Sequence, residues 1–242
     1  MTKQRINRIL SLAGVASRRK ADEWIQSGRV TLNGLVVRAL GEKAVWGVDR
    51  IEVDGQAIPG PSERIYLMLN KPFGYVCSLN DPLGRPVVSD LLKGIKQRLY
   101  PVGRLDFDSL GLLLFTNDGE WAHRLSHPRF RVPKTYKVTL QGKLTDKALG
   151  QLTEGVHLED GFSGPAKVTL LRSSQQQSLV RITITSGRRR LVRRMTEAVG
   201  FPTVHLIRTG LGMLELGNLK VGAFRPLEPS EVEAMKKMVR LV

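Results

Sequence analysis

The chain has 242 residues, of which 41% are hydrophobic, enough for a packed core and too many for a disordered polyelectrolyte. Lysine and arginine number 38 against 22 acidic residues, and the formal net charge of +16 indicates a polyanionic partner, most simply nucleic acid. The sequence contains no apolar run of about 18 residues, no long amphipathic anchor and no signal peptide, so we expect a cytoplasmic protein without membrane association.

The N-terminal segment predicts two short helices. Apolar residues recur at helical spacing between residues 6 and 13, with Thr2 as a possible N-cap and Gly14 at the end of the run. A second helix is expected to open at Ser17 and to stop at Gly28, because glycine is favoured just past the C-terminal end of a helix.

A short twisted sheet is expected to follow these helices. The runs RVTLNGLVV and RIEVDGQAI each contain two strand-like stretches joined by a tight turn, at Asn33-Gly34 and Asp54-Gly55. A compact cluster of proline, glycine and serine comes next. The sequence therefore predicts one domain over residues 1–58, a linker over 59–64 and a second domain over 65–242.

Basic side chains gather on the two predicted helices. Residues 1–40 hold eight lysines and arginines but only two acids. A solvated helix surface is the ordinary explanation for such charges, but in a chain that is basic throughout, a face that contacts phosphates is the better interpretation. The segment RINRILSLAGVASRRKADEWIQSGRVTLNG looks like an S4-like RNA-binding domain. The candidate RNA contacts here are Arg5, Arg8, Arg18, Arg19, Lys20 and Arg29.

Beyond the linker, strand-like and helical runs alternate irregularly, and no glycine-rich dinucleotide fingerprint is present. This pattern favours an α+β fold in which a small helical and β-stranded first domain precedes a mixed, mainly antiparallel second domain. The strand-like runs are IYLMLN, GLLLFT, KTYKVTL, AKVTLL and LVRITIT, and the helical runs are WAHRLSH, DKALGQLTEG, LVRRMTEAVG and SEVEAMKKMV.

The segment most informative for chemistry is a polar loop, Gly103 to Ser109, that leads into the apolar strand Gly111 to Phe115. A strand buried on both faces holds such a loop rigidly at one end, which suits a reacting side chain. Arg104, Asp106 and Asp108 lie in this loop. From composition alone, either aspartate would most often cap the loop, and two carboxylates without further ligands are a weak metal signal.

The motifs in this part of the chain closely resemble those of the RsuA/RluB family of rRNA pseudouridine synthases, and they occur in the family's order. They are Asn70-Lys71-Pro72 with Gly74-Tyr75, Asp81-Pro82 with Gly84-Arg85-Pro86, Gly103-Arg104-Leu105-Asp106, Lys134-Thr135-Tyr136 and the arginine-rich run from Gly187 to Met195. The resemblance implies that the second domain is the catalytic domain, that Asp106 is the catalytic carboxylate and that Asp108 is structural.

Pseudouridine formation breaks the N1–C1′ bond of a uridine, turns the uracil and rejoins it through C5. No group is oxidised or added, so we expect no cofactor and no metal. A carboxylate suits the first step, as in glycoside chemistry, but the sequence leaves open whether it attacks C1′, attacks C6 or removes the 2′ proton.

The resemblance also assigns partners to Asp106. Tyr136 would stack on the freed uracil, whereas an aromatic packed in the core is the alternative. Arg193 would keep Asp106 ionised, with phosphate contact as its alternative. Because enzymes that act on a base usually take it out of its stack, Arg104 is expected to fill the vacated space or to hold a phosphate, with a capping or surface role as its alternative. The surrounding arginines are expected to face RNA or solvent, and the candidate contacts among them are Arg188, Arg190 and Arg194.

Two places depart from the family pattern. Ser186 stands where an acidic residue is common, and Leu191 stands where a polar residue is usual. These departures leave the local hydrogen bonding of the arginine-rich run open and do not alter the expected reaction.

Two other functions compete with this one. The charge and the S4-like segment alone would fit a non-catalytic RNA-binding protein of ribosome assembly. A metal-dependent nuclease would need a carboxylate cluster that the sequence lacks, and His123 and His127 have no third ligand. The single cysteine, Cys77, excludes both an intrachain disulfide and a cysteine metal cluster.

We expect a monomer that acts on ribosomal RNA or on a ribosome-assembly intermediate. The stretch at residues 81–86 favours large-subunit (23S) RNA, and the residues around Asn70-Lys71-Pro72 leave the small-subunit (16S) RNA as the alternative.

Overall fold

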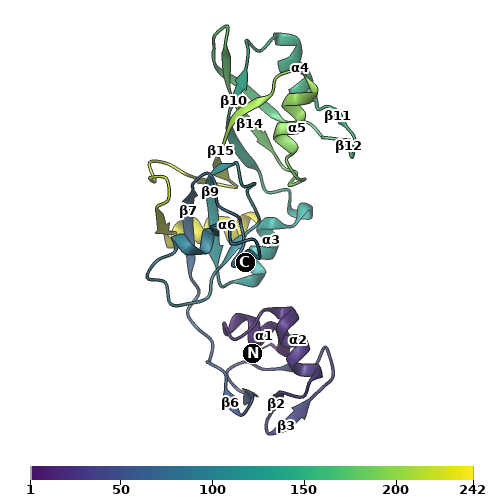
Figure 1. The fold of residues 1–242 in the computed structure, drawn as a ribbon, viewed down its shortest axis with the longest axis vertical. Coiled ribbons are helices and arrows are strands. Elements are labelled where there is room, and N and C mark those ends of the chain that lie inside the picture. Colours follow the sequence, from purple (N-terminus) through teal and green to yellow (C-terminus); the bar gives the residue numbers. More distant parts are fainter. Residues whose placement is uncertain (1, 242) are drawn as a thin grey trace. The chain divides into compact units, whose positions relative to one another are not determined.

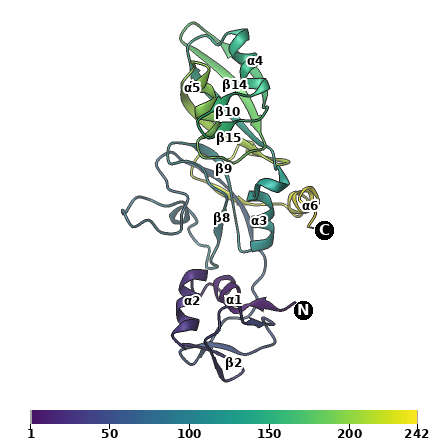
Figure 2. The ribbon, with the colours of Figure 1, turned by 90° about the vertical axis from the view of Figure 1, so that its right-hand side faces the viewer.

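The computed structural model describes residues 2–241, and these divide into two compact units (Figures 1 and 2). One unit runs up to Ile65 and includes Gly94–Leu99 and Asn117–Gly119. The other holds Tyr66–Lys93, Tyr100–Thr116 and the chain from Glu120 onward. No helix within residues 2–241 is long and apolar enough to cross a membrane.

The first unit consists of two helices and small antiparallel sheets. Its four-stranded sheet has the order β3-β2-β5-β6, and a separate two-stranded sheet pairs β1 with β4. The elements are β1 (Gln4–Arg5), α1 (Ile6–Leu12), α2 (Arg18–Gln26), β2 (Val30–Leu32), β3 (Leu35–Val37), β4 (Lys43–Ala44), β5 (Ile51–Val53) and β6 (Gln56–Ala57).

Local signals in the sequence account for most of this unit. The Ser17 side chain caps α2 by accepting a hydrogen bond from the Lys20 amide, as the sequence predicts. The turn residues Asn33 and Gly34 both have positive φ, and so do Asp54 and Gly55, which confirms the two tight hairpins. The predicted Thr2 cap is wrong, because the chain enters α1 through β1 and Arg5 takes the N-cap position without a side-chain bond.

A small apolar core holds the first unit together. Ile6, Ile9 and Leu10 of α1 pack with Ala21 and Ile25 of α2 against residues of the sheet, and all five are buried. The apolar positions of each helix thus lie on one face, and packing of these faces against the sheet stabilises helices that would be marginal alone at this length.

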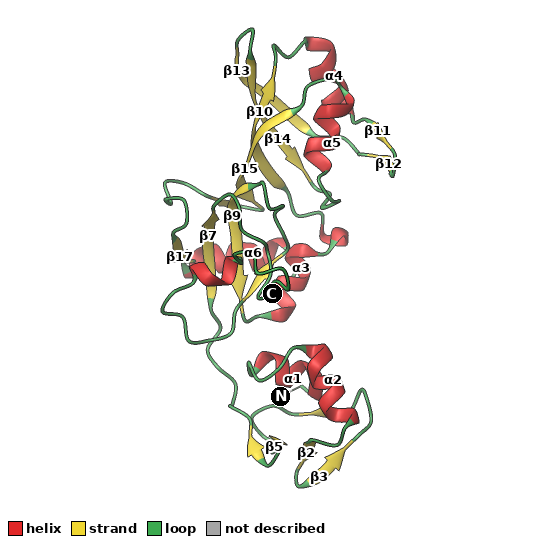
Figure 3. Ribbon diagram, viewed as in Figure 1, coloured by secondary structure: helices red, strands yellow, loops and turns green. Residues whose placement is uncertain are grey.

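The second unit is built on a mixed sheet with the order β13-β14-β10-β15-β9-β7-β17 (Figure 3). In addition, β8 pairs with β9 and β16 pairs with β15. Only the β9–β15 pair is parallel among these described pairs, and the α+β, mainly antiparallel fold is confirmed. The strands are β7 (Tyr66–Lys71), β8 (Tyr100–Val102), β9 (Leu110–Thr116), β10 (Lys134–Gln141), β13 (Lys167–Ser173), β14 (Gln177–Ile184), β15 (Thr203–Leu211), β16 (Leu214–Glu215) and β17 (Phe224–Pro226).

Helices and short elements complete this unit. Trp121 and Leu125 of α3 (Gly119–Ser126) pack with Val232 and Met235 of α6 (Pro229–Met238) against Leu112 and other residues of the sheet. These two helices therefore cover the part of the sheet near β9. The helices are α3 (Gly119–Ser126), α4 (Asp146–Glu154), α5 (Leu191–Ala198) and α6 (Pro229–Met238), with the short hairpin β11 (His157–Leu158) and β12 (Gly161–Phe162), and the 3-10 turns η1 (Val88–Leu91) and η2 (Pro128–Phe130).

Candidate active site

The second unit contains a cavity of about 380 Å³. Its wall combines the loop between β8 and β9, the inward side chains of β10 and β15, and residues 186–192, which lead into α5. Arg104, Asp106, Tyr136, Arg188 and Arg190 all line it, so the fold brings five of the predicted site residues to one place. This volume lies in the range of small-molecule pockets and is large enough for a single nucleobase.

The Asp106 side chain is half-buried in the cavity wall. Its backbone carbonyl accepts a hydrogen bond from the Ser109 amide at 3.1 Å, which closes a tight turn within the loop. Among residues 2–241, no hydrogen bond or ion pair reaches the Asp106 carboxylate. The carboxylate is therefore held by its backbone and left open toward the cavity.

Lys71 holds the Asp106 loop in place through hydrogen bonds to its backbone. It lies at the end of β7 and is fully buried, and its ammonium donates to the carbonyl oxygens of Ser109 at 2.8 Å, Pro72 at 3.0 Å and Phe107 at 3.4 Å. Burial lowers the pKa of Lys71, an effect opposed by the nearby charges of Cys77, Asp108 and Asp106. Three carbonyls match the three donors of an ammonium, so Lys71 acts as a clamp on the Asp106 loop.

Asp108 ties the same loop to the entrance of α5. Arg190 donates to both of its carboxylate oxygens, at 3.0 and 3.1 Å, and the Arg193 guanidinium lies 3.2 Å from that carboxylate. Arg193 also donates to the carbonyl oxygens of Asp108 at 3.0 Å and Thr203 at 3.2 Å. The sequence predicts that Arg193 pairs with Asp106. In the structure the Arg193 guanidinium instead contacts Asp108, two residues farther along the loop.

Tyr136 and Arg208 face the cavity from paired positions of β10 and β15. Tyr136 is 8% exposed and Arg208 only 3%. Arg208 donates through Nε to the Leu112 carbonyl at 2.7 Å, but its Nη2 has no partner among the described residues. A buried charged donor without an acceptor is costly, so an acceptor brought by a ligand would relieve it.

Sequence reasoning missed Arg208. The signal available was an arginine within the apolar run Val-His-Leu-Ile-Arg, at an inward position two residues after Leu206. Only the pairing of β15 with both β9 and β10 shows that this position reaches the cavity.

A lysine also lines the cavity. Lys134 is half-buried at the start of β10 and donates to the Val132 carbonyl at 2.9 Å. Burial, with a smaller contribution from the positive charge of Arg208, lowers the pKa of Lys134 from 10.5 to about 8. The charge of Lys134 therefore changes as the pH passes through about 8.

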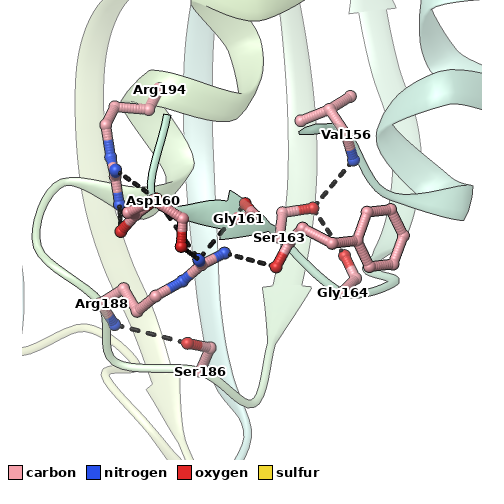
Figure 4. A network of polar contacts seen from close by, with 9 residues as sticks. Val156, Asp160, Gly161, Ser163, Gly164, Ser186, Arg188 and Arg194 are labelled. Atoms are coloured by element: carbon pink, nitrogen blue, oxygen red, sulfur yellow. Dashed lines mark hydrogen bonds and ion pairs between the residues drawn. The ribbon is translucent and has the colours of Figure 1, made fainter. Parts of the chain in front are cut away.

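The arginines predicted to contact RNA differ in how they are held. Arg188 donates to the Asp160 and Phe162 carbonyl oxygens, at 3.2 and 2.8 Å, and the Asp160 carboxylate pairs with Arg188 at 3.3 Å and Arg194 at 2.8 Å (Figure 4). These contacts bind the β11–β12 hairpin to α5. Neighbouring Arg190 is held by Asp108, whereas no carboxylate within residues 2–241 pairs with the exposed Arg104.

The predicted RNA contacts of the first unit fall into two groups. Arg29 is bound to Asp54, with 2.9 Å from its Nε to the carboxylate, and lies over the Trp24 ring at 4.8 Å, and Lys20 pairs with Glu23 at 2.7 Å. Among the residues that the structure describes, the others have no carboxylate within ion-pair distance, namely Arg5, Arg8, Arg18 and Arg19. The second group keeps its charge available for phosphates.

No cluster of three or more histidine, cysteine, aspartate or glutamate side chains that could hold a metal occurs in the described part of the chain.

Comparisons with known proteins show the family of this chain. Residues 65–198 match the family described as RNA pseudouridylate synthase, and residues 4–44 match the S4 domain. The chain belongs to the RNA pseudouridylate synthase family. It is therefore an isomerase that acts on RNA, and the family resemblance expected from its motifs is confirmed.

Relatives match along the whole chain. Ribosomal large subunit pseudouridine synthase B of Bacillus subtilis (strain 168) is 44% identical over 97% of this chain and 96% of its own length. An RNA pseudouridine synthase of Aquifex aeolicus (strain VF5) is 43% identical over 100% of this chain and 97% of its own. A crystal structure of a pseudouridylate synthase superposes with a TM-score of 0.70 at 32% identity, covering 96% of this chain and 99% of that one.

Proposed function

We propose that this protein converts a specific uridine of large-subunit ribosomal RNA to pseudouridine, with Asp106 as the catalytic carboxylate. The observation that carries the proposal is the position of Asp106 at the wall of the cavity, with its carboxylate unbonded among residues 2–241. The name of the B. subtilis relative, ribosomal large subunit pseudouridine synthase B, supports large-subunit RNA as the substrate. A small-subunit target is the alternative that mapping would reveal.

The cavity residues divide the work of the reaction. A flipped uridine would place its C1′ and uracil near Asp106, where the carboxylate meets the positive character that develops as the N1–C1′ bond breaks. Tyr136 offers a ring face that retains the freed uracil while it turns. Arg208 offers a buried donor for a uracil carbonyl or a phosphate oxygen, because its Nη2 lacks an acceptor among the described residues.

Other residues hold and position this machinery. Lys71 and the pair Arg190 and Arg193 clamp the Asp106 loop from two sides, through its backbone carbonyls and through Asp108. A loop fixed in this way loses no conformational freedom when the substrate enters. We assign Arg193 this positioning role, and Arg104 the role of contacting the phosphate backbone or the vacated base position.

The first unit would supply sequence-independent RNA affinity, with residues 1–58 as the RNA-binding domain, 59–64 as the linker and 65–242 as the catalytic domain. Its unpaired arginines suit phosphate contacts. Ribosomal RNA or an assembling subunit is then the substrate, which places the protein in the cytoplasm, and we propose a monomer because one chain supplies every residue that lines the cavity.

The substitution Asp106→Asn tests the catalytic assignment, since it keeps the shape of the side chain and removes its charge. We expect it to abolish pseudouridine formation in ribosomal RNA while RNA affinity stays nearly unchanged, measured by nucleotide-resolution pseudouridine mapping and by filter binding. The matched control Asp108→Asn, on the same loop, should slow the reaction without abolishing it. Normal modification by the Asp106→Asn variant would refute the proposal.

Mapping in cells with and without the gene identifies the target. A site lost from large-subunit RNA is expected, and a site lost only from small-subunit RNA would reverse the choice between the two.

A further inference from the structure

Two exposed phenylalanine rings, Phe107 in the Asp106 loop and Phe73 after β7, lie close to each other. Phe107 directly follows Asp106 and is 43% exposed, and Phe73 lies two residues after Lys71 and is 61% exposed. Their ring centroids are 6.0 Å apart, with the planes inclined by 59°. Exposed single hydrophobic residues are common on proteins, but two adjacent aromatic rings next to a reacting carboxylate form a local apolar patch that a ligand can cover.

The backbone under these rings is fixed. The Gly74 amide donates to the Phe107 carbonyl at 3.0 Å, and the same carbonyl accepts from the buried Lys71 ammonium at 3.4 Å. The two segments that carry the rings are therefore bonded to each other, although each is a loop. An aromatic ring with two side-chain torsions on a fixed backbone loses little entropy when something stacks on it.

The surroundings indicate which ligand this patch fits. The next exposed side chain along the loop is Arg104, whose guanidinium has no carboxylate partner among residues 2–241 and also lines the cavity. An aromatic face next to an available cation is the combination that binds unpaired nucleotides, because the base stacks while the phosphate pairs with the charge. Phe107 directly follows Asp106, which lines the cavity, so a nucleotide next to the one in the cavity lies within reach of the Phe107 ring.

We propose that Phe107, supported by its contact with the Phe73 ring, forms a stacking platform for the unpaired base adjacent to the target uridine. The platform binds RNA only and takes no part in breaking or forming bonds. It holds the strand on one side of the extruded nucleotide, so that the uridine stays out of its helix while Asp106 acts. The proposal rests on the proposed function and adds to it a second nucleotide subsite.

Steady-state kinetics with four variants test the platform. Phe107→Leu and Phe73→Leu keep an apolar side chain but remove the ring, and we expect KM for the RNA to rise roughly 5- to 150-fold for Phe107→Leu, the range that base–aromatic stacking energies give. We expect a smaller rise for Phe73→Leu, and Phe107→Trp, which restores a stacking face, should keep KM within about threefold of the unsubstituted protein. Leu83→Ala removes a 74% exposed apolar side chain from the same loop region as Phe73 and should leave KM unchanged.

A fluorescence measurement reports stacking directly. The probe is a stem-loop RNA with 2-aminopurine in place of an unpaired base beside a loop uridine, bound to the Asp106→Asn protein so that no turnover occurs. We expect quenching on binding, which is lost with the additional Phe107→Leu change and kept with Leu83→Ala.

Two results would overturn the platform. One is an unchanged KM together with unchanged quenching in Phe107→Leu. The other is an equal loss in Leu83→Ala, which would indicate general apolar contact without stacking. Failure of the proposed function would give a different result, because the unsubstituted protein would then form no pseudouridine in ribosomal RNA. The quenching measurement would still show whether Phe107 stacks on a base.

Discussion

Lys71 and Lys134 both lie near the Asp106 loop and are both at least partly shielded from solvent, but their roles differ because their hydrogen-bond partners differ. The Lys71 ammonium is enclosed and meets three backbone carbonyls, which stabilise its charge and fix the loop. Lys134 is half-buried, has one carbonyl partner and lies in the field of Arg208, which explains why its pKa falls to about 8. The first lysine is a structural clamp, and the second is a cation whose charge depends on pH.

Lys134 predicts a pH dependence of RNA binding. Its folded-state pKa of about 8 lies below the ordinary lysine value of 10.5, so its charge is present at pH 7 and is lost as the pH rises through 8. RNA affinity should therefore fall between pH 7 and 9, and the salt slope of binding should decrease by about one. Lys134→Arg, which stays charged over this range, should bind without this loss. Equal pH profiles for the two proteins would contradict the prediction.

The same shift has a consequence for stability. Between about pH 8 and 10.5 the unfolded chain binds a proton at Lys134 that the folded chain has released, so this residue makes the fold more stable as the pH rises through that window.

At the residue scale, the sequence motifs located most of the cavity wall. Asp106, Arg104 and Tyr136 were predicted from short motifs and line one cavity. The partner of Arg193 was not predictable, because Asp106 and Asp108 lie two residues apart and only the turn of the loop decides which of them reaches α5. Arg208 was missed for the same reason, since its neighbours come from two distant strands.

At the element scale, the parallel pairing of β9 with β15 joins the two parts of the active site. β9 carries the Asp106 loop at its N-terminal end, and β15 carries Arg208. The strands approach closely at Gly111, which has a φ of +103° and where an added Cβ would lie 2.2 Å from the Arg208 carbonyl oxygen. Glycine is required here both for its conformation and for the space.

Gly111→Ala should therefore destabilise the protein by about 3 kcal/mol or more, the sum of overpacking and backbone strain, and lower its activity further by shifting the loop. Thermal unfolding and pseudouridine formation measure the two effects. Gly84→Ala is the matched control, because Gly84 has a φ of +69° but no atom within 4 Å of an added Cβ, so only about 1–2 kcal/mol of strain is expected. Similar losses in both variants would show that the close approach at Gly111 is unimportant.

Elements with a strong local sequence signal were predictable from the sequence, whereas strands whose place depends on pairing with distant strands were not. The apolar run of β9 and the serine cap of α2 identified their elements in advance. β15 is the nine-residue strand that was not expected, because its first three residues are half-buried or exposed and Arg208 interrupts the apolar pattern. Its place between β10 and β9 depends on residues far away in the sequence.

At the scale of the whole molecule, the excess of positive charge is divided into arginines bound by carboxylates and arginines without such partners. Arg188, Arg190 and Arg194 are used to hold the catalytic unit together, through Asp160 and Asp108. Net charge alone would have counted them equally with Arg18 and Arg19, which are exposed at the start of α2 and pair with no carboxylate among the described residues. Electrostatic RNA affinity should come mainly from the second kind.

The double substitution Arg18→Gln and Arg19→Gln tests this division. Each phosphate contact contributes roughly 0.7–0.9 to the slope of log affinity against log salt, so the slope should become shallower by about 1.4–1.8 while pseudouridine formation at saturating RNA is unchanged. Lys143→Gln with Lys147→Gln removes the same charge from exposed positions just before and in the first turn of α4 and should leave the slope as it was. If both double variants flatten the slope equally, RNA affinity follows net charge, and the S4-like helices have no special role in binding.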